Sequence, residues 1–136
     1  MRFRLRKAEV IRGTGRFSEI IRKGKRLRAV HIECSYRTQA WDRGGTGPRM
    51  MVGFAVGRQV RRAVDRNRVK RLMREAYRTV LPQIVEELPA GDVGIELILH
   101  FPRKNARLTT IPPLLEFRGD VQALLQQIRK LLTPAS

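Results

Sequence analysis

Apolar residues near the start of the chain recur at helical spacing. Phe17, Ile20 and Ile21 are separated by intervals of three and four residues, which predicts a short amphipathic helix. Thr14 is the expected N-cap of this helix, because threonine side chains accept hydrogen bonds from a first helical turn. Gly24 follows two basic residues and is the expected stop.

The next pattern has the period of a strand. Residues 29–37 alternate between apolar and polar side chains, which predicts a half-buried strand. Residues 50–56 are continuously apolar and predict an inner strand. The glycine-rich segment 38–49 is expected to be a loop, so that the two strands form an antiparallel hairpin. The apolar face of the first strand consists of Val30, Ile32, Cys34 and Tyr36.

A long amphipathic helix is predicted from Val64 onward, where apolar residues again fall on one side. The stretch of residues 58–78 also carries nine Lys or Arg residues against two acids. Pro82 fits poorly inside a helix and predicts an end or a kink just before it. The helix thus has one face to bury and one face suited to a polyanion. The apolar positions are Val69, Leu72, Met73, Ala76, Tyr77 and Val80, and the basic stripe is Arg66, Lys70, Arg74 and Arg78.

The last third of the chain predicts a strand at residues 93–101 and a final helix from about Asp120, the expected N-cap. This order of elements predicts a sheet with helices packed on it and excludes an all-helical or all-β fold. At 136 residues the chain fits one domain, 1–136, with a short tail at 133–136. Residues 1–12 are expected to form a flexible basic arm, either extended or an ordinary solvated leader. The apolar stripe of the final helix is Val121, Leu124, Leu125, Ile128, Leu131 and Leu132.

The charge of the chain indicates its class of partner. There are 29 Lys and Arg residues against 12 Asp and Glu, a formal net charge of +17. A small domain needs a net charge of only about 2 to 8 for solubility, so this excess predicts a nucleic-acid partner. The N-terminal segment has no apolar run long enough for a secretory signal, and no stretch approaches the length of a membrane span. The single cysteine suits a reducing compartment. The expected location is therefore cytoplasmic, with no membrane partner.

Side chains suited to catalysis are sparse in the sequence. The acids are scattered, and no phosphate-loop or zinc-ligand spacing is present. His31 and His100 are the only histidines, and both fall within strand patterns, which favours structural roles over acid–base catalysis. Cys34 lies in an alternating pattern and is expected in the core. The sequence therefore predicts a binding protein without catalytic side chains of its own.

The basic helix and the strand before it resemble the protein subunit of bacterial ribonuclease P. The triplet Arg66-Asn67-Arg68 precedes an aliphatic residue and a Lys-Arg pair, as in the signature of that family. Residues 52–58, VGFAVGR, resemble the strand that leads into the helix. The resemblance is strongest over residues 52–78. Weaker resemblance extends over residues 17–24, 93–102 and 121–132.

This resemblance implies an α/β sandwich of the α+β type, in which about four strands pack with three helices in the order α-β-β(-β)-α-β-α. It also implies a left-handed crossover between the strands that flank the basic helix, although the general rule is right-handed. The family's protein partners a catalytic RNA, and together they remove the 5′ leader of precursor tRNA. The resemblance therefore places catalysis on the RNA with Mg²⁺, with no dedicated metal site on the protein and no obligate protein partner.

By this resemblance the basic helix contacts the catalytic RNA. A row of guanidinium groups suits this role, because it neutralises several backbone phosphates at once. Asn67 can bond a base, a phosphate or a hydrated metal ion, or it can instead cap the backbone near the helix start. The expected residues for binding the catalytic RNA are Arg66, Asn67, Arg68, Lys70, Arg71 and Arg74.

The resemblance also implies a cleft between the first helix and the sheet that receives the single-stranded leader. Unstacked bases need apolar or aromatic surface, and core packing is the alternative role for each apolar candidate. The family usually has an aromatic residue at the position of Ile21, so core packing is the favoured role there. The expected leader-binding residues are Phe17, Ile21, Tyr36 and, at the strand–helix junction, Arg58.

Two other functions remain open from the sequence. A non-catalytic ribosomal or other structural RNA-binding protein would account for the charge alone. A DNA-binding helix-turn-helix protein would need a short helix just before the basic helix, and the sequence shows no convincing helix pair there. Sequencing the RNA that copurifies with the chain separates the first of these from a ribonuclease P protein.

Overall fold

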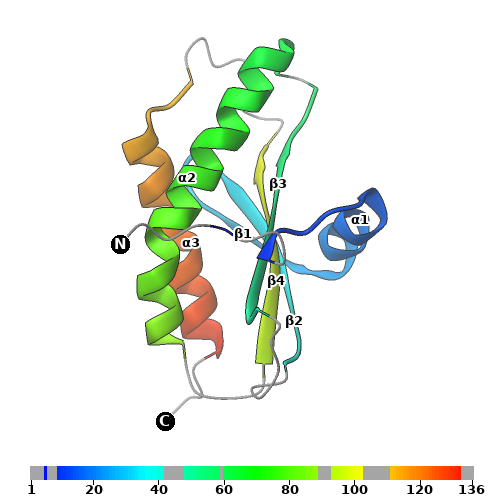
Figure 1. The fold of residues 1–136 in the computed structure, drawn as a ribbon, viewed down its shortest axis with the longest axis vertical. Coiled ribbons are helices and arrows are strands. Elements are labelled where there is room, and N and C mark those ends of the chain that lie inside the picture. Colours follow the sequence, from blue (N-terminus) through cyan, green and yellow to red (C-terminus); the bar gives the residue numbers. More distant parts are fainter. Residues whose placement is uncertain are drawn as a thin grey trace.

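Four strands in the described part of the chain form one mixed sheet, and helices cover both of its faces (Figure 1). This computed structural model describes residues 5, 9–41, 48–58, 60–88, 93–102 and 111–132. The predicted order of helices and strands is confirmed. In chain order the elements are α1 (Thr14–Lys23), β1 (Lys25–Arg28), β2 (Glu33–Ala40), β3 (Met50–Val56), α2 (Ala63–Glu87), β4 (Val93–Phe101) and α3 (Leu114–Leu132).

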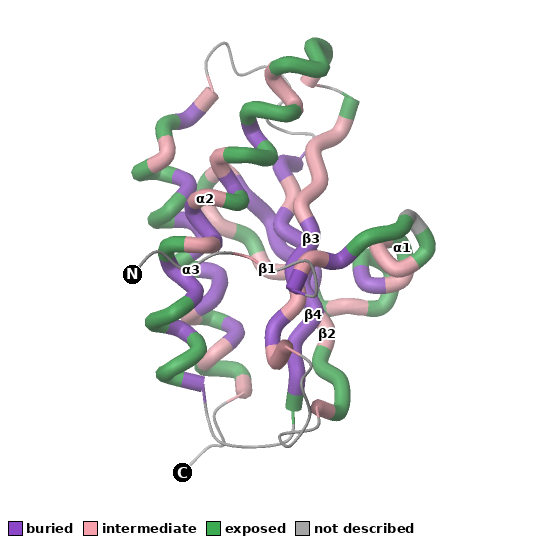
Figure 2. Tube along the Cα trace, in the orientation of Figure 1, coloured by how far each residue is buried: buried purple, intermediate pink, exposed green. Residues whose placement is uncertain are grey.

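Strand β4 lies in the interior of the sheet, whose order is β1-β2-β4-β3. It pairs antiparallel with β2 and parallel with β3, and it is buried along nearly its whole length (Figure 2). Because β4 separates β2 from β3, the predicted hairpin between these two strands is wrong, and β2 forms its hairpin with β1 instead. The parallel β3–α2–β4 unit is confirmed, and its left-handed sense stays a prediction.

Strand β3 is an edge strand, although its apolar sequence predicts an inner one. Residues 9–11, which we call the N-terminal strap, lie against its outer edge. Val10 forms a parallel bridge with Val52, and the backbone N–H of Ile11 donates to the Val52 carbonyl at 2.8 Å. Glu9 and Ile11 are buried, so these residues are not part of a solvated arm. The strap shields an edge that would otherwise expose unpaired backbone groups.

Strand β2 buries both of its faces over residues 33–36. The predicted half-buried strand is wrong here, because α1 covers one face of the sheet while α2 and α3 cover the other (Figure 1). Ile32 and Cys34 belong to the main core on the side of α2 and α3, as predicted. Val30 precedes the strand and is 72% exposed.

Helix α2 buries the predicted apolar stripe against α3 and β3, except for Leu72, which is half-buried. Pro82 lies inside the helix, which continues to Glu87, so the predicted end before Pro82 is wrong. Packing of the following turn overrides the unfavourable proline, since Ile84 is fully buried while Pro82 itself is exposed. The alternative of a kink at Pro82 stays a prediction.

Helix α1 begins one residue earlier than predicted. Thr14 is its first residue and Gly13 is the N-cap, so the prediction of Thr14 as the N-cap is wrong. No side chain caps the start of this helix. The φ angle of Gly13 is 94°, a conformation that glycine adopts at low steric cost. Gly24 closes the helix as predicted, and its N–H donates to the Ile20 carbonyl at 2.8 Å.

Helix α3 begins at Leu114, so the prediction of Asp120 as its N-cap is wrong. Asp120 lies inside the helix and is almost fully buried. Its Oδ2 atom accepts hydrogen bonds from the backbone N–H groups of His31, at 2.6 Å, and Ile32, at 3.2 Å. The carboxylate therefore ties the turn between β1 and β2 to α3.

Replacing Asp120 with alanine is expected to lower the free energy of unfolding by about 2 to 3 kcal/mol, because two backbone N–H groups lose a charged acceptor. Asp120→Asn keeps an acceptor oxygen and should lose less. Urea unfolding followed by circular dichroism measures both, with Gln122→Ala on the exposed side of α3 as the control. A loss no larger than that of the control would contradict the proposed link.

Candidate nucleic-acid interface

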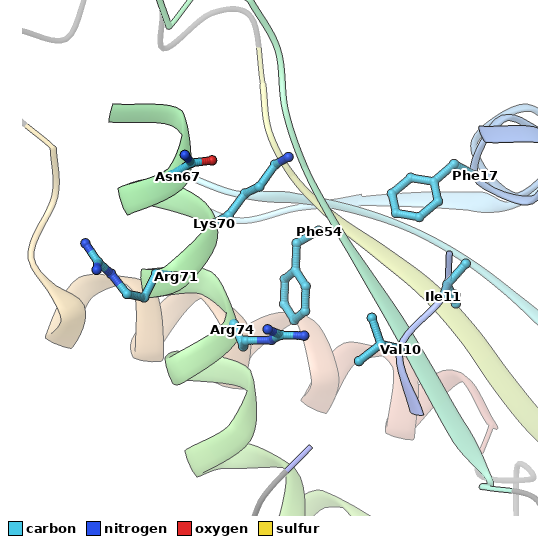
Figure 3. A pocket seen from close by; sticks show the side chains of 8 residues that line it. All are labelled: Val10, Ile11, Phe17, Phe54, Asn67, Lys70, Arg71 and Arg74. Carbon is cyan, nitrogen blue, oxygen red and sulfur yellow. The ribbon is translucent and has the colours of Figure 1, made fainter. Parts of the chain in front are cut away.

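Two adjoining hollows of about 410 and 420 Å³ lie where α1, β3 and α2 meet. They share Phe17, Phe54 and Lys70, and we refer to them together as the groove. One wall is apolar and comes from the N-terminal strap, α1 and β3. The other wall comes from α2 and is polar and basic: Asn67, Lys70, Arg71 and Arg74 (Figure 3).

Phe17 projects from α1 toward β3 and forms part of the apolar wall (Figure 3). The ring lies directly over Gly53: a Cβ atom at residue 53 would come within 2.5 Å of the Phe17 ring and 2.8 Å of Ile98. Gly53 thus allows the ring to approach the backbone of β3. Phe17 is half-buried, so it both packs on the sheet and presents surface to the groove.

A network of ion pairs holds α1 against the sheet behind Phe17. Glu96 in β4 is fully buried and accepts from Arg16 Nε at 2.6 Å and from Arg37 Nε at 2.9 Å. Arg37 Nη1 also donates to Glu19 at 2.8 Å, and this hydrogen bond lowers the pKa of the Glu19 carboxyl. The two arginines come from α1 and β2, so Glu96 joins three elements.

Phe54 stands at the centre of the groove, between its two walls (Figure 3). Its ring meets Tyr77 of α2 edge to face, with centroids 6.1 Å apart, which fixes its orientation. The Arg74 guanidinium lies 5.9 Å from the Phe54 centroid, within cation–π range. Lys70 extends from α2 toward β3, whereas the guanidinium of Arg71 points to the other side of the helix (Figure 3).

The basic residues of the predicted stripe on α2 have different surroundings: those at its two ends have partners within the protein, and those in the middle line the groove. Arg66 Nη1 donates to the backbone carbonyls of Val60, at 2.8 Å, and Arg61, at 2.9 Å, so Arg66 also stabilises the segment that enters the helix. Arg78 pairs with Glu75. The middle of the stripe, Lys70 and Arg74, lines the groove together with Asn67 and Arg71.

Asn67 and Arg68 also belong to the predicted RNA-binding set, and the sequence pattern does not show whether they lie inside or outside the groove. Asn67 lies in the second turn of α2, whose N-cap is Arg62, so its alternative role as a backbone cap is wrong. It is exposed on the wall of the groove. Arg68 is exposed and is not among the residues that line either hollow.

The structure does not bring the predicted leader-binding residues together. Tyr36 is 3% exposed and packs in the main core on the face of the sheet toward α2 and α3, so its expected place beside Phe17 is wrong. Ile21 lies one turn after Phe17 on α1 but does not line either hollow, and at 37% exposure it is not a core residue either. Arg58 is exposed just after β3, at the predicted junction with the helix segment.

Several residues that form or support the groove were not predicted from the sequence patterns. Phe54 lies in a uniformly apolar run, which gives no signal that separates a groove residue from a core residue. Val10 and Ile11 of the strap line the groove although they fall within the predicted arm. Glu96 had a usable signal, since a carboxylate inside an otherwise apolar strand must find partners when buried.

The described residues offer little for catalysis by the protein itself. Among them there is no group of three or more His, Cys, Asp or Glu side chains arranged to hold a metal ion. His31 lies beside Glu116 of α3, whereas His100 lies beside Glu33, and burial lowers the pKa of His100. Cys34 is in the core as predicted, and burial raises the pKa of its thiol to about 12. At neutral pH this thiol is not a nucleophile.

None of the helices in the described ranges is both long and apolar enough to cross a bilayer.

Comparison with known proteins places these observations in a family. The family model described as Ribonuclease P matches residues 5–111. The ribonuclease P protein component of Chlorobaculum tepidum is 34% identical over 127 residues, covering 91% of this chain and 82% of the relative. That of Xanthomonas oryzae is 51% identical over 97 residues, covering 71% and 57%.

Solved structures show the same fold. The RNase P protein from Thermotoga maritima aligns with a TM-score of 0.62 at 20% identity, covering 88% of this chain and 96% of that protein. The RNase P protein of Staphylococcus aureus gives a TM-score of 0.60 at 17% identity, covering 93% and 100%. At these identities the likeness supports the architecture of three helices and a mixed sheet.

Proposed function

This chain belongs to the family of ribonuclease P protein components, RNA-binding subunits of an endoribonuclease whose RNA is catalytic, and we propose that its groove binds the single-stranded 5′ leader of precursor tRNA. The observation that carries this proposal is the pairing of an aromatic, apolar wall with a basic wall in one hollow. Single-stranded RNA presents bases and phosphates that suit these two walls respectively.

The chemistry of each wall supports an assignment within the groove. Phe17 and Phe54 offer apolar surface for unstacked bases, while Lys70 and Arg74 stand opposite for backbone phosphates. Asn67 carries both a donor and an acceptor, and its exposed place on the wall lets it bond a base, a phosphate or a hydrated metal ion. Arg58 at the junction after β3 is the further candidate for a leader phosphate.

The outward side of α2 is the proposed contact with the catalytic RNA. Arg68 is exposed outside the groove, and the guanidinium of Arg71 points away from β3, so both can face a second RNA while the groove is occupied. Arg66 contributes to this surface and also stabilises the segment before the helix. The two faces of one helix would then place the leader beside the catalytic RNA.

Mg²⁺ is proposed to act through the RNA, with the protein supplying positive charge that reduces repulsion between phosphates. The same neutralisation lowers the amount of Mg²⁺ that the complex needs. We propose that this complex works in the cytoplasm, where a lone cysteine such as Cys34 stays reduced.

Phe17→Ala tests the groove assignment. The variant, assembled with the catalytic RNA, is expected to bind precursor tRNA with a leader about 5- to 150-fold more weakly, since one base–aromatic stack contributes roughly 1 to 3 kcal/mol. Binding of mature tRNA should stay within about twofold of the parent. Dissociation constants for both RNAs measure the effect, and Leu115→Ala, an exposed apolar residue on α3, is the control.

An equal loss for precursor and mature tRNA would contradict the groove assignment. The wider function has its own test, cleavage of precursor tRNA at low Mg²⁺ by the RNA alone and by the RNA with the protein. If the protein gave no improvement there, its proposed role in the complex would be wrong.

A further inference from the structure

Strand β1 forms the edge of the sheet opposite to the groove. The strand order places β2 and β4 between β1 and β3, a separation of roughly 14 Å at about 4.8 Å per strand. A single RNA strand seated in the groove at β3 therefore does not need to cover the β1 edge. The side chains of this edge are free to meet a different molecule or a different part of the same complex.

The β1 edge carries a concentration of positive charge. Five cations fall within residues 22–28, and all of them are exposed. Two acids lie nearby: Glu19 pairs with Arg37 and Lys23, and the buried Glu33 pairs with Arg28 at 3.0 Å. We define the basic edge as Arg22, Lys23, Lys25, Arg26 and Arg28.

Cations project from both faces of this strand. Lys25 pairs with Tyr36, which faces the core beside α2 and α3. Arg26 pairs with Ser35, which in turn pairs with Ile98 of β4, and Ile98 packs with Ile20 of α1 on the opposite face. No carboxylate in the described ranges forms an ion pair with Lys25 or Arg26. Lys25 also lines a hollow of about 320 Å³ together with Lys23 and Arg37. The charge therefore wraps around the edge of the sheet instead of lying on one face.

Charged residues on an edge strand have a general use, which is to prevent pairing with the edge of another molecule. That use does not require the charges to be positive, and it does not account for Arg22 and Lys23, which belong to α1. A cluster of one sign that spans two elements is the electrostatic footprint of a polyanion site.

The surroundings of the basic edge favour a base-paired RNA over a single strand. Tyr36 lines the hollow beside the edge but is only 3% exposed, so the described residues there offer very little aromatic surface for stacking. Base-paired RNA presents mainly its backbone and is recognised by shape and phosphate contacts. Phosphate contacts at two separated places fix the orientation of a rigid protein on an RNA.

We propose that the basic edge is a second anchor for the catalytic RNA, which binds a base-paired segment through its phosphates. The inference rests on the proposed function, because it takes the catalytic RNA as the partner. With α2 as the first anchor, the second would prevent rotation of the protein about that helix. The groove would then face the leader in one orientation.

Charge reversal at single positions tests this anchor. Lys25→Glu and Arg26→Glu keep a charge on the edge, so protection against edge pairing is retained while a phosphate contact is lost. Each is expected to reduce the slope of log affinity for the catalytic RNA against log salt by about 0.9, which corresponds to about an eightfold loss at 0.1 M salt. Arg118→Glu, exposed on α3, is the control with the same change in net charge.

The assay uses the full chain and the catalytic RNA alone, and a second series uses mature tRNA. A slope and an affinity equal to those of Arg118→Glu would overturn the proposal. An effect on mature tRNA without one on the catalytic RNA would also overturn it and assign the edge to the substrate. If a glutamate variant fails to fold, Arg26→Gln gives the same test with a neutral side chain.

The inference and the proposed function fail separately. If Phe17→Ala discriminates between precursor and mature tRNA while the edge variants match their control, only the second anchor is wrong. If Phe17→Ala has no selective effect, the groove assignment is wrong whatever the edge variants do.

Discussion

Glu96→Ala is expected to lower the free energy of unfolding by about 2 to 4 kcal/mol. Removing one partner of a buried ion pair commonly costs about 3 to 5 kcal/mol, and the partial exposure of the two arginines reduces this. The side chains of Arg16 and Arg37 are 38% and 26% exposed, whereas that of Glu96 is 1% exposed. The loss therefore comes mainly from two cations that remain near the sheet without their shared carboxylate.

The same substitution should weaken leader binding, because Arg16 precedes Phe17 on α1. Without Glu96 the helix loses its tie to β4, and the ring loses its fixed place over Gly53. Urea unfolding measures the stability, and the dissociation constant for precursor tRNA measures the positioning. Glu96→Gln keeps an acceptor for one arginine and should recover part of both losses.

Glu87→Ala is the matched control for Glu96, since Glu87 pairs with Arg129 at a more exposed site and should contribute less than about 1 kcal/mol. If Glu96→Ala were no more destabilising than this control, the buried network would not be what holds α1. If stability fell but the affinity for precursor tRNA stayed unchanged, Glu96 would be structural without positioning Phe17.

The helices show how far the sequence alone could go. The apolar period from Val69 to Val80 predicts the buried side of α2 correctly, because a long amphipathic helix can bury only its apolar side against a sheet. The start of α3 was missed, since an aspartate before an apolar stripe is a typical N-cap and nothing local shows that Asp120 instead caps a distant turn. Its partners are about ninety residues away in the chain.

The sheet was harder to predict because strand order depends on contacts between distant segments. The run of residues 50–56 is apolar on both faces, and the sequence cannot distinguish an inner strand from an edge covered by the N-terminal strap. For residues 33–36 the alternation gave the correct two faces, but α1 buries the second one as well. Tyr36 lies on the first of these faces, in the core with α2 and α3, so its predicted place beside Phe17 of α1 was wrong.

The candidate site could be predicted in part, and by resemblance more than by pattern. Phe17 and the middle of the basic stripe do meet in one groove. Local sequence could not show that Arg66 has partners within the protein, because those contacts depend on the conformation of the chain before α2. The pair of Arg78 with Glu75 had a usable signal, since residues three apart are neighbours on a helix.

Gly53→Ala is expected to destabilise the protein by about 1 to 3 kcal/mol, the usual range for an overpacked core. The added methyl group would lie 2.5 Å from the Phe17 ring and 2.8 Å from the end of the Ile98 side chain. The ring must then move off the sheet, so binding of precursor tRNA should weaken while binding of mature tRNA does not. Urea unfolding and the two dissociation constants measure these effects.

The double variant Phe17→Ala/Gly53→Ala separates this steric mechanism from a change in the backbone. With the ring removed, the methyl group enters space that the ring occupied, so Gly53→Ala should cost at least about 1 kcal/mol less in the Phe17→Ala background. Gly15→Ala, where an added Cβ meets no atom within 4 Å, is the control. Additive losses in the double variant would show that Gly53 supports β3 by itself and does not make room for Phe17.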